Sequence, residues 1–248
     1  MKDYLLYLFL GHILGDFYFQ TEKIARLKDR SYKGVLIHSF EYLLIMIALA
    51  IPFLSVDMLL AAGYASAVHW VIDSGKYIVK KKKHFSDLGM FVIDQMLHAI
   101  SIIILALTFC VWHFIVNGKQ IIALAQMLSI DTYVLKWVLS ILLIHKPVNI
   151  FIQKFLKDYK PADDKNTGND DIINREKNIG RIIGTIERIV MLILISRNQY
   201  AALGLVLTAK SITRYDRIVK DKAFAEYYLL GTLMSVLCVL VISVIVTI

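Results

Sequence analysis

Long apolar stretches, separated by short polar and basic segments, run through almost the whole chain. A helix that crosses a bilayer needs about 20 mostly apolar residues, and eight stretches approach or reach this length. The pattern therefore predicts an all-α, polytopic bundle of transmembrane helices with about eight spans. The expected spans are 4–20, 35–55, 57–79, 87–116, 133–156, 181–197, 199–215 and 226–248.

Basic residues are concentrated in every second loop, namely in the segments that follow the first, third, fifth and seventh spans. After the first span come Lys23, Arg26, Lys28, Arg30 and Lys33. By the positive-inside rule such loops are cytoplasmic, so we expect a multi-pass protein of the bacterial cytoplasmic (inner) membrane. With 58% hydrophobic residues, the chain is too apolar for an ordinary soluble domain. Its net charge of +8 then indicates contact with anionic membrane lipid, and no nucleic-acid partner is expected.

One long polar segment divides the chain. Residues 158–178 contain Pro161, Gly168 and two adjacent pairs of aspartates, which favours a loop. We therefore expect an N-terminal membrane bundle over residues 1–157, a cytoplasmic linker over 158–178 and C-terminal membrane helices over 179–248. The sequence leaves the oligomeric state open and is compatible with a homo-oligomer.

Histidine and aspartate recur four residues apart within the N-terminal apolar stretches. The pairs are His12/Asp16, His69/Asp73 and Asp94/His98, and a further histidine, His38, lies near the start of the second stretch. Residues i and i+4 lie on one face of a helix, and ionisable groups inside a membrane span are costly and usually functional. The pairs therefore predict one shared polar site. Gln95, next to Asp94, is expected to point about 100° away from it.

The position of each carboxylate along its helix supports a shared site. Asp16 and Asp73 each lie seven residues before a basic cytoplasmic segment, which is about 10 Å at a rise of 1.5 Å per residue. On the same scale, Asp94 lies roughly 16 Å and His38 about 8 Å from the nearest basic loop. We therefore expect all four residues in the cytoplasmic half of the bilayer.

Imidazole nitrogens combined with carboxylate oxygens are typical ligands of zinc and manganese. The predicted cofactor is a divalent metal, Zn or Mn, and the ligands suffice for one or two ions. The predicted metal ligands are His12, Asp16, His69, Asp73, Asp94 and His98. The predicted catalytic residues are His38, Asp73 and Asp94, with Gln20 and Lys76 placed to orient or bind the substrate.

The C-terminal part carries charges in its apolar stretches but no histidine. Cationic side chains there could hold a phosphate by charge-assisted hydrogen bonds, so we predict four further substrate-binding residues: Arg181, Arg188, Lys210 and Arg214. The alternative is a buried ion-pair network, in which Glu187 pairs with Lys210 or Arg214. Gly180 and Gly184, four residues apart, predict a close approach between helices.

The order and spacing of these motifs resemble a known family. The segments His12-x3-Asp16-Phe17-x2-Gln20, His38, His69-x2-Ile72-Asp73-x2-Lys76 and Asp94-Gln95-x2-His98 are similar to the bacterial membrane family called domain of unknown function 3307 (DUF3307). The C-terminal motifs around Gly180, Lys210 and Glu226 resemble its longer members. The resemblance implies a membrane protein and no particular activity. More loosely, the chain is similar to membrane-bound metal-dependent hydrolases, which also carry His and Asp on successive membrane helices.

Together these observations favour metal-dependent hydrolysis of a phosphoester or ester, with a lipid among the candidate substrates. A bound metal makes hydroxide available near neutral pH, and the predicted depth would place the reaction at the inner-leaflet interface. Two alternatives stay open. The same residues could carry metal ions or protons through a transporter, or they could hold together a non-enzymatic membrane stress or defence effector.

Overall fold

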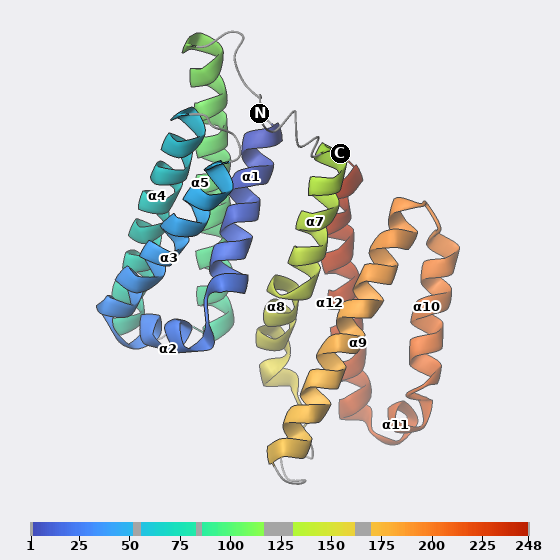
Figure 1. Ribbon diagram of the computed structural model, residues 1–248. Coiled ribbons are helices and arrows are strands. Elements are labelled where there is room, and N and C mark those ends of the chain that lie inside the picture. Colours follow the sequence, from blue (N-terminus) through green and yellow to red (C-terminus); the bar gives the residue numbers. More distant parts are fainter. Residues whose placement is uncertain (1, 52–55, 83–85, 117–130, 162–169, 248) are drawn as a thin grey trace. The chain divides into compact units, whose positions relative to one another are not determined.

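The computed structural model describes residues 2–51, 56–82, 86–116, 131–161 and 170–247 (Figure 1). Its regular elements within these ranges are all helical, and each of the eight predicted spans is helical over most of its described residues. The all-α prediction is therefore confirmed. Residues 162–169 of the predicted linker lie outside the described residues, whereas a helix already begins at Asp170. The linker over 158–178 stays a prediction.

The chain forms two compact units, Met1–Leu139 and Ser140–Ile248. The sequence placed the division later, in the linker 158–178, so the two descriptions of domain organisation differ. The first unit contains α1 (Lys2–Ile13), the π-helix η1 (Leu14–Phe19), α2 (Glu22–Arg30), α3 (Tyr32–Ala50), α4 (Val56–Lys82) and α5 (Asp87–Val116). In it α3 packs on α4, α4 on α5, and α1 on both α3 and α5. Figure 1 shows the short helix α2 lying across one end of this bundle.

The apolar core of the first unit fills the end of the bundle away from α2. It contains three small residues of α4, which let neighbouring helices approach closely. The buried residues are Tyr4, Leu8, Tyr42, Met46, Ala50, Met58, Ala61, Ala62, Ala65, Ile102, Ala106 and Phe109. The predicted polar site occupies the same inward faces nearer to α2. Each long helix thus has an apolar half and a polar half on one face.

The second unit is built around α9 (Asp170–Ser196) and α12 (Lys222–Thr247), which pack on each other. The boundary between the two units falls inside α7 (Thr132–His145). The predicted span 133–156 is two helices, α7 and α8 (Pro147–Leu156), because Pro147 cannot continue a helix and starts a new one at its first position. The remaining helices are α10 (Tyr200–Ile212), packed on α9, and the short α11 (Tyr215–Lys220) before α12.

Four helical segments among the described residues are long and apolar enough to cross a membrane. They are Tyr32–Ala50, Asp87–Val111, Thr132–Tyr159 and Lys222–Ile245. Two shorter apolar helices are Tyr4–Phe19 and Tyr200–Ile212. Many large apolar side chains face outward, among them Val71 at 61% and Leu205 at 70% exposure, as expected for helices that face lipid. These findings support a helical membrane protein; the larger number of about eight spans is not confirmed.

Gly34 sets the position of α2. A Cβ at Gly34 would overlap the backbone of Leu27 and Lys28 at the end of α2, so the two helices meet backbone to backbone. Ser31 secures the junction, because its Oγ accepts from Gly34 N at 3.2 Å and donates to the Leu27 carbonyl at 3.3 Å. The backbone of α2 therefore cannot relax around a side chain at position 34.

We expect Gly34→Ala to lower the free energy of unfolding by about 1–3 kcal/mol, because backbone atoms must move to admit the methyl group. The matched control is Gly63→Ala in α4, where a Cβ would meet nothing within 4 Å. That change should be neutral or stabilise by roughly 0.5–1 kcal/mol through helix propensity. Thermal unfolding of both variants in detergent compares them, and equal midpoints would contradict the proposed docking of α2.

Candidate metal centre

Asp16 lies in η1, a π-helical segment that continues α1 directly. π-helical turns are rare and occur often at functional sites. The spacing argument for His12 and Asp16 assumed a regular α-helix, whereas Asp16 lies in a π-helical turn. The helix ends at Gln20, whose backbone is extended and whose N–H donates to the Gly15 carbonyl at 3.3 Å. Gln20 is half-buried at this end, and its role in binding substrate stays a prediction.

The carboxylate of Asp16 is the common partner of two histidines from other helices. His38 Nε2, on α3, lies 3.0 Å from Asp16 Oδ1, and His69 Nε2, on α4, lies 2.8 Å from the same oxygen. An ionised carboxylate only accepts hydrogen bonds, so each imidazole donates its Nε2 proton. The Nδ1 atoms of both histidines are buried and have no hydrogen-bond partner among the described residues.

Asp73, Asp94 and His98 form a second group, in which the ligand atoms face one another without hydrogen bonding. His98 Nε2 lies 3.8 Å from Asp73 Oδ1 and 3.7 Å from Asp94 Oδ1. All three atoms are buried, and none has a hydrogen-bond partner in the part of the chain that the structure describes. Ligands of a tetrahedral metal with bonds near 2.1 Å lie about 3.4 Å apart. The separations are therefore closer to those of metal ligands than to those of hydrogen-bonded pairs.

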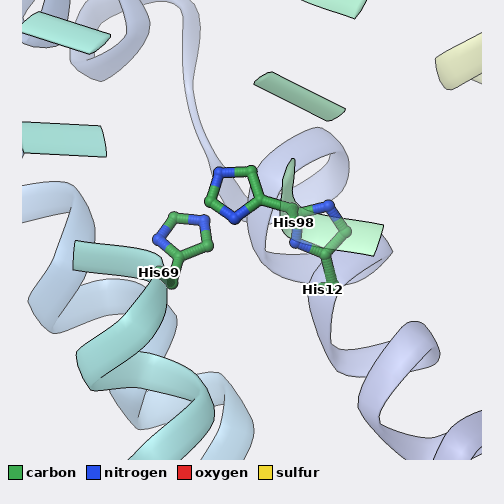
Figure 2. A group of neighbouring side chains, drawn as sticks. All are labelled: His12, His69 and His98. Atoms are coloured by element: carbon green, nitrogen blue, oxygen red, sulfur yellow. The ribbon is translucent and has the colours of Figure 1, made fainter. Parts of the chain in front are cut away.

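Three histidine rings make a third group (Figure 2). Ring centroids lie 4.3 Å apart for His69 and His98, 4.9 Å for His12 and His98, and 5.8 Å for His12 and His69. Figure 2 shows a nitrogen of each ring turned toward the space between the three side chains. His69 thus belongs both to this group and to the Asp16 group, while His98 belongs to this group and to the Asp73 group.

All seven predicted His and Asp residues consequently lie in one continuous cluster, because the three groups share members. Asp73 joins the groups further: its Oδ2 lies 3.6 Å from both His38 Nε2 and His69 Nδ1, while its Oδ1 faces His98. The expectation of a single shared site is met by this geometry. It is carried by α1, η1, α3, α4 and α5, which supply one or two residues each.

The structure adds Lys28 to the cluster, a residue that the sequence analysis assigned only to the basic loop. Lys28 is the buried residue of α2, and its Nζ lies 2.7 Å from Asp73 Oδ2. Burial alone would lower the pKa of the Lys28 ammonium, but the carboxylates of Asp16 and Asp73 outweigh it and raise that pKa. Its position four residues after Ile24, on the less polar face of α2, was the available sequence signal.

Gln95 corrects a second expectation. Its side chain does not point away from Asp94 but donates from Nε2 to Asp94 Oδ2 at 3.3 Å and to Asp16 Oδ2 at 3.5 Å. Its Oε1 lies 3.4 Å from His12 Nε2. The expected angle of about 100° between Asp94 and Gln95 describes only the directions of their Cα–Cβ bonds. Rotation about the three side-chain torsions of Gln95 is enough to turn its amide toward Asp94. Gln95 therefore links Asp94 of one potential ligand group to Asp16 and His12 of the other two.

Tyr42 was also missed. It stacks on His69, with ring centroids 3.8 Å apart and an angle of 21° between planes. Gly15 allows this arrangement, since a Cβ there would lie 2.6 Å from Tyr42 Cδ2. The spacing of His38 and Tyr42, four residues on one helix, repeats the spacing of the His/Asp pairs and could have indicated the contact.

Lys76 lies at the edge of the cluster, and its predicted role in binding substrate stays a prediction. Its Nζ is 2.6 Å from Asp94 Oδ2, and its side chain is 23% exposed. Lys76 and Lys28 thus each neutralise one buried carboxylate of the Asp73, Asp94 and His98 group.

The predicted cationic residues of the second unit have different surroundings. Lys210 pairs with Glu187 at 2.6 Å, which matches the ion-pair alternative for these two residues. Arg188 is buried and donates to Asn149 Oδ1 at 2.6 Å and to Ser235 Oγ at 3.3 Å. Arg181 and Arg214 are exposed, and the anion subsite stays a prediction.

The two glycines of α9 do not mark a helix contact in the described structure. A Cβ at Gly180 would meet nothing within 4 Å, and a Cβ at Gly184 would lie 3.2 Å from Nη1 of Arg188 on the same helix. Gly184 therefore makes room for the Arg188 guanidinium, and the predicted close approach through this pair is wrong.

Residues 4–112 match the family model described as "Protein of unknown function (DUF3307)". The resemblance seen in the motifs is thus confirmed for this part of the chain, which contains all seven His and Asp residues of the cluster. The C-terminal motifs lie beyond the matched residues. No curated protein and no solved structure matches the chain.

We expect Lys76→Met to lower the free energy of unfolding of the metal-free protein by about 3 kcal/mol, because it leaves the Asp94 carboxylate buried without its cation. Lys80→Met is the matched control on the same helix: Lys80 pairs with Asp29 at 2.9 Å, but both side chains are about half exposed. Such a pair contributes roughly 0.2–1 kcal/mol. Denaturation in detergent with a chelator present measures both, and similar losses would contradict the importance of the buried pair.

Proposed function

We propose that this chain, whose residues 4–112 match the DUF3307 family model, is an integral membrane protein that binds one or two divalent metal ions and hydrolyses a phosphoester or ester. One observation carries the proposal: seven buried or half-buried His and Asp residues lie in three potential ligand groups that share His69 and His98. The candidate ions are zinc and manganese, which accept nitrogen and oxygen ligands.

The hydrogen-bonding state of the cluster favours metal binding over polar packing. Buried polar groups that serve only packing are nearly always hydrogen-bonded. Here three ligand atoms of one group, His98 Nε2, Asp73 Oδ1 and Asp94 Oδ1, lack partners among the described residues. A cation bound to these atoms would satisfy all of them at once.

The charge of the cluster favours a cation as well. Its three carboxylates face two ammonium groups, those of Lys28 and Lys76, which leaves one net negative charge when the imidazoles are neutral. An uncompensated buried charge is strongly destabilising. A bound divalent cation compensates this negative charge and gives the cluster one net positive charge.

Asp73 is suited to bridge two ions. Its Oδ1 faces His98, and its Oδ2 faces His38 and His69. One ion would be held by Asp73, Asp94 and His98, and a second by Asp16, His38 and His69, with His12 beside both groups. Paired metal sites in hydrolases typically hold their ions about 3.5–4 Å apart.

Divalent cations in such sites supply Lewis-acid chemistry and lower the pKa of a coordinated water. With a single ion held by Asp73, Asp94 and His98, His38 is not a ligand and would serve as the proton acceptor: its Nδ1 is buried and has no hydrogen-bond partner among the described residues, while its Nε2 is held by Asp16. In the reaction, the water oxygen bonds to phosphorus or carbon and the ester bond breaks. The proton taken from water is returned to the leaving oxygen, giving an alcohol and an acid.

The same proposal includes eight spans in a bacterial inner membrane, with the cluster in the cytoplasmic leaflet. Four helices of sufficient length and hydropathy support membrane insertion. The basic residues of α2 support its cytoplasmic side, because positively charged loops stay in the cytoplasm. Among the remaining spans, the two shorter apolar helices, Tyr4–Phe19 and Tyr200–Ile212, would be tilted or buried among others.

Transport of metal ions or protons is the weaker candidate. A transporter needs a polar path through the whole bundle, whereas the described core beyond the cluster contains apolar residues such as Leu8, Met46 and Ile102. A non-enzymatic effector would need no unpartnered ligand atoms. The arrangement therefore supports chemistry at one side of the membrane.

Hydrolysis should depend on both the metal and the cluster. Protein purified in nanodiscs and loaded with Mn²⁺ or Zn²⁺ should hold one or two ions per chain and hydrolyse p-nitrophenyl phosphate, p-nitrophenyl acetate or phosphatidic acid. His98→Gln should fold, lose metal by elemental analysis and lose at least about 100-fold in rate, the scale of a lost catalytic contribution. Lys23→Gln, an exposed change in α2, should retain both.

Two results would contradict the proposal. One is a folded protein that takes up no stoichiometric metal. The other is a metal-loaded protein that hydrolyses none of the substrates but lets Mn²⁺ into proteoliposomes, with the flux lost in Asp73→Asn; this would favour the transporter.

A further inference from the structure

The position of α2 holds the Lys28 side chain against the cluster. The helix begins at an N-cap, Thr21, whose Oγ1 accepts from Ile24 N at 3.3 Å, and it ends against Gly34. Its other charged residues are exposed, whereas Lys28 is 8% exposed and points into the bundle. Lys80 holds the far end of α2 through Asp29 at 2.9 Å. The Lys28 ammonium is therefore fixed in position, unlike a mobile surface lysine.

Lys28 and Lys76 reach the same group of ligand atoms from different helices. Lys28 Nζ lies 2.7 Å from Asp73 and Lys76 Nζ lies 2.6 Å from Asp94, and these two carboxylates belong with His98 to one potential metal group. A cation bound there takes the carboxylate oxygens as ligands. Each ammonium then has hydrogen-bond donors available within a few ångströms of that cation.

The charge balance then calls for an anion. With one divalent cation the three carboxylates and two ammonium groups carry one net positive charge, and with two cations they carry three. Burying such an excess is costly unless an anion compensates it. A neutral carboxylic ester brings no charge, whereas a phosphate group brings one or two and accepts charge-assisted hydrogen bonds from lysine.

We infer that Lys28 and Lys76 form an anion subsite beside the metal position and that the substrate carries an ionised phosphate group. The inference rests on the proposed function, because the positive excess exists only when a divalent cation is bound. The phosphate could come from a lipid headgroup or from a soluble phosphomonoester, and both would present the same oxygens to the two ammonium groups.

The test measures phosphate binding to Mn²⁺-loaded protein in nanodiscs. In one arm inorganic phosphate is titrated calorimetrically into protein in phosphatidylcholine; in the other, phosphatidic acid replaces part of the lipid and thermal stabilisation is read. Lys28→Gln and Lys76→Gln should each weaken binding about 10- to 100-fold, the loss expected for a hydrogen bond to a charged group. Lys28→Arg should keep most of the affinity. Lys23→Gln, an exposed change in α2, should bind as the unchanged protein does.

The arms separate the two phosphate sources, since a soluble ligand acts in the first arm and a lipid headgroup only in the second. Metal content and circular dichroism identify any variant that fails to fold; if Lys28→Gln does, Lys76→Gln decides. Unchanged affinity in a folded lysine variant would contradict the inference, as would metal-loaded protein that binds phosphate in neither arm. A protein that binds no metal would instead contradict the proposed function itself.

Discussion

Three buried carboxylates must be compensated by groups within reach, and much of the first unit is arranged around this constraint. Moving an ion out of water costs several kcal/mol even after relaxation, so each carboxylate has its own partners. Asp16 accepts from His38 and His69, Asp73 faces Lys28, and Asp94 faces Lys76. The ammonium of Lys28 comes from α2, which explains why this helix lies across the end of the bundle and why Gly34 allows it to approach so closely.

The same faces of the long helices carry both the apolar core and the polar cluster. On α4, small residues around Ala61 and Ala65 are followed by His69 and Asp73; on α5, Asp94 and His98 are followed by Ile102 and Ala106. The apolar half holds the helices together with non-directional contacts, so the polar half is free to leave ligand atoms unpaired. The apolar half therefore stabilises the bundle, and the ligand atoms of the polar half stay available to bind a cation at the end of the bundle nearer to α2.

The sequence predicted the cluster well because its members obey helical periodicity. His69/Asp73 and Asp94/His98 needed only a regular helix, and their meeting at one level of the bundle needed only the rise per residue. What it could not predict depends on side-chain torsions and on contacts between distant residues. Side-chain torsions turn the Gln95 amide toward Asp16, and a contact between distant residues buries Lys28 against Asp73. The π-helical turn around Asp16 likewise has no signature in the apolar pattern.

The most direct test of the account is X-ray absorption spectroscopy at the zinc edge of purified, zinc-loaded protein. We predict a first coordination sphere of imidazole nitrogen and carboxylate oxygen at about 2.0–2.2 Å, and the variant in which glutamine replaces His98 should no longer hold zinc in this sphere. A sphere of oxygen ligands only, unaltered by that replacement, would show that the ion is bound elsewhere and would contradict the metal centre.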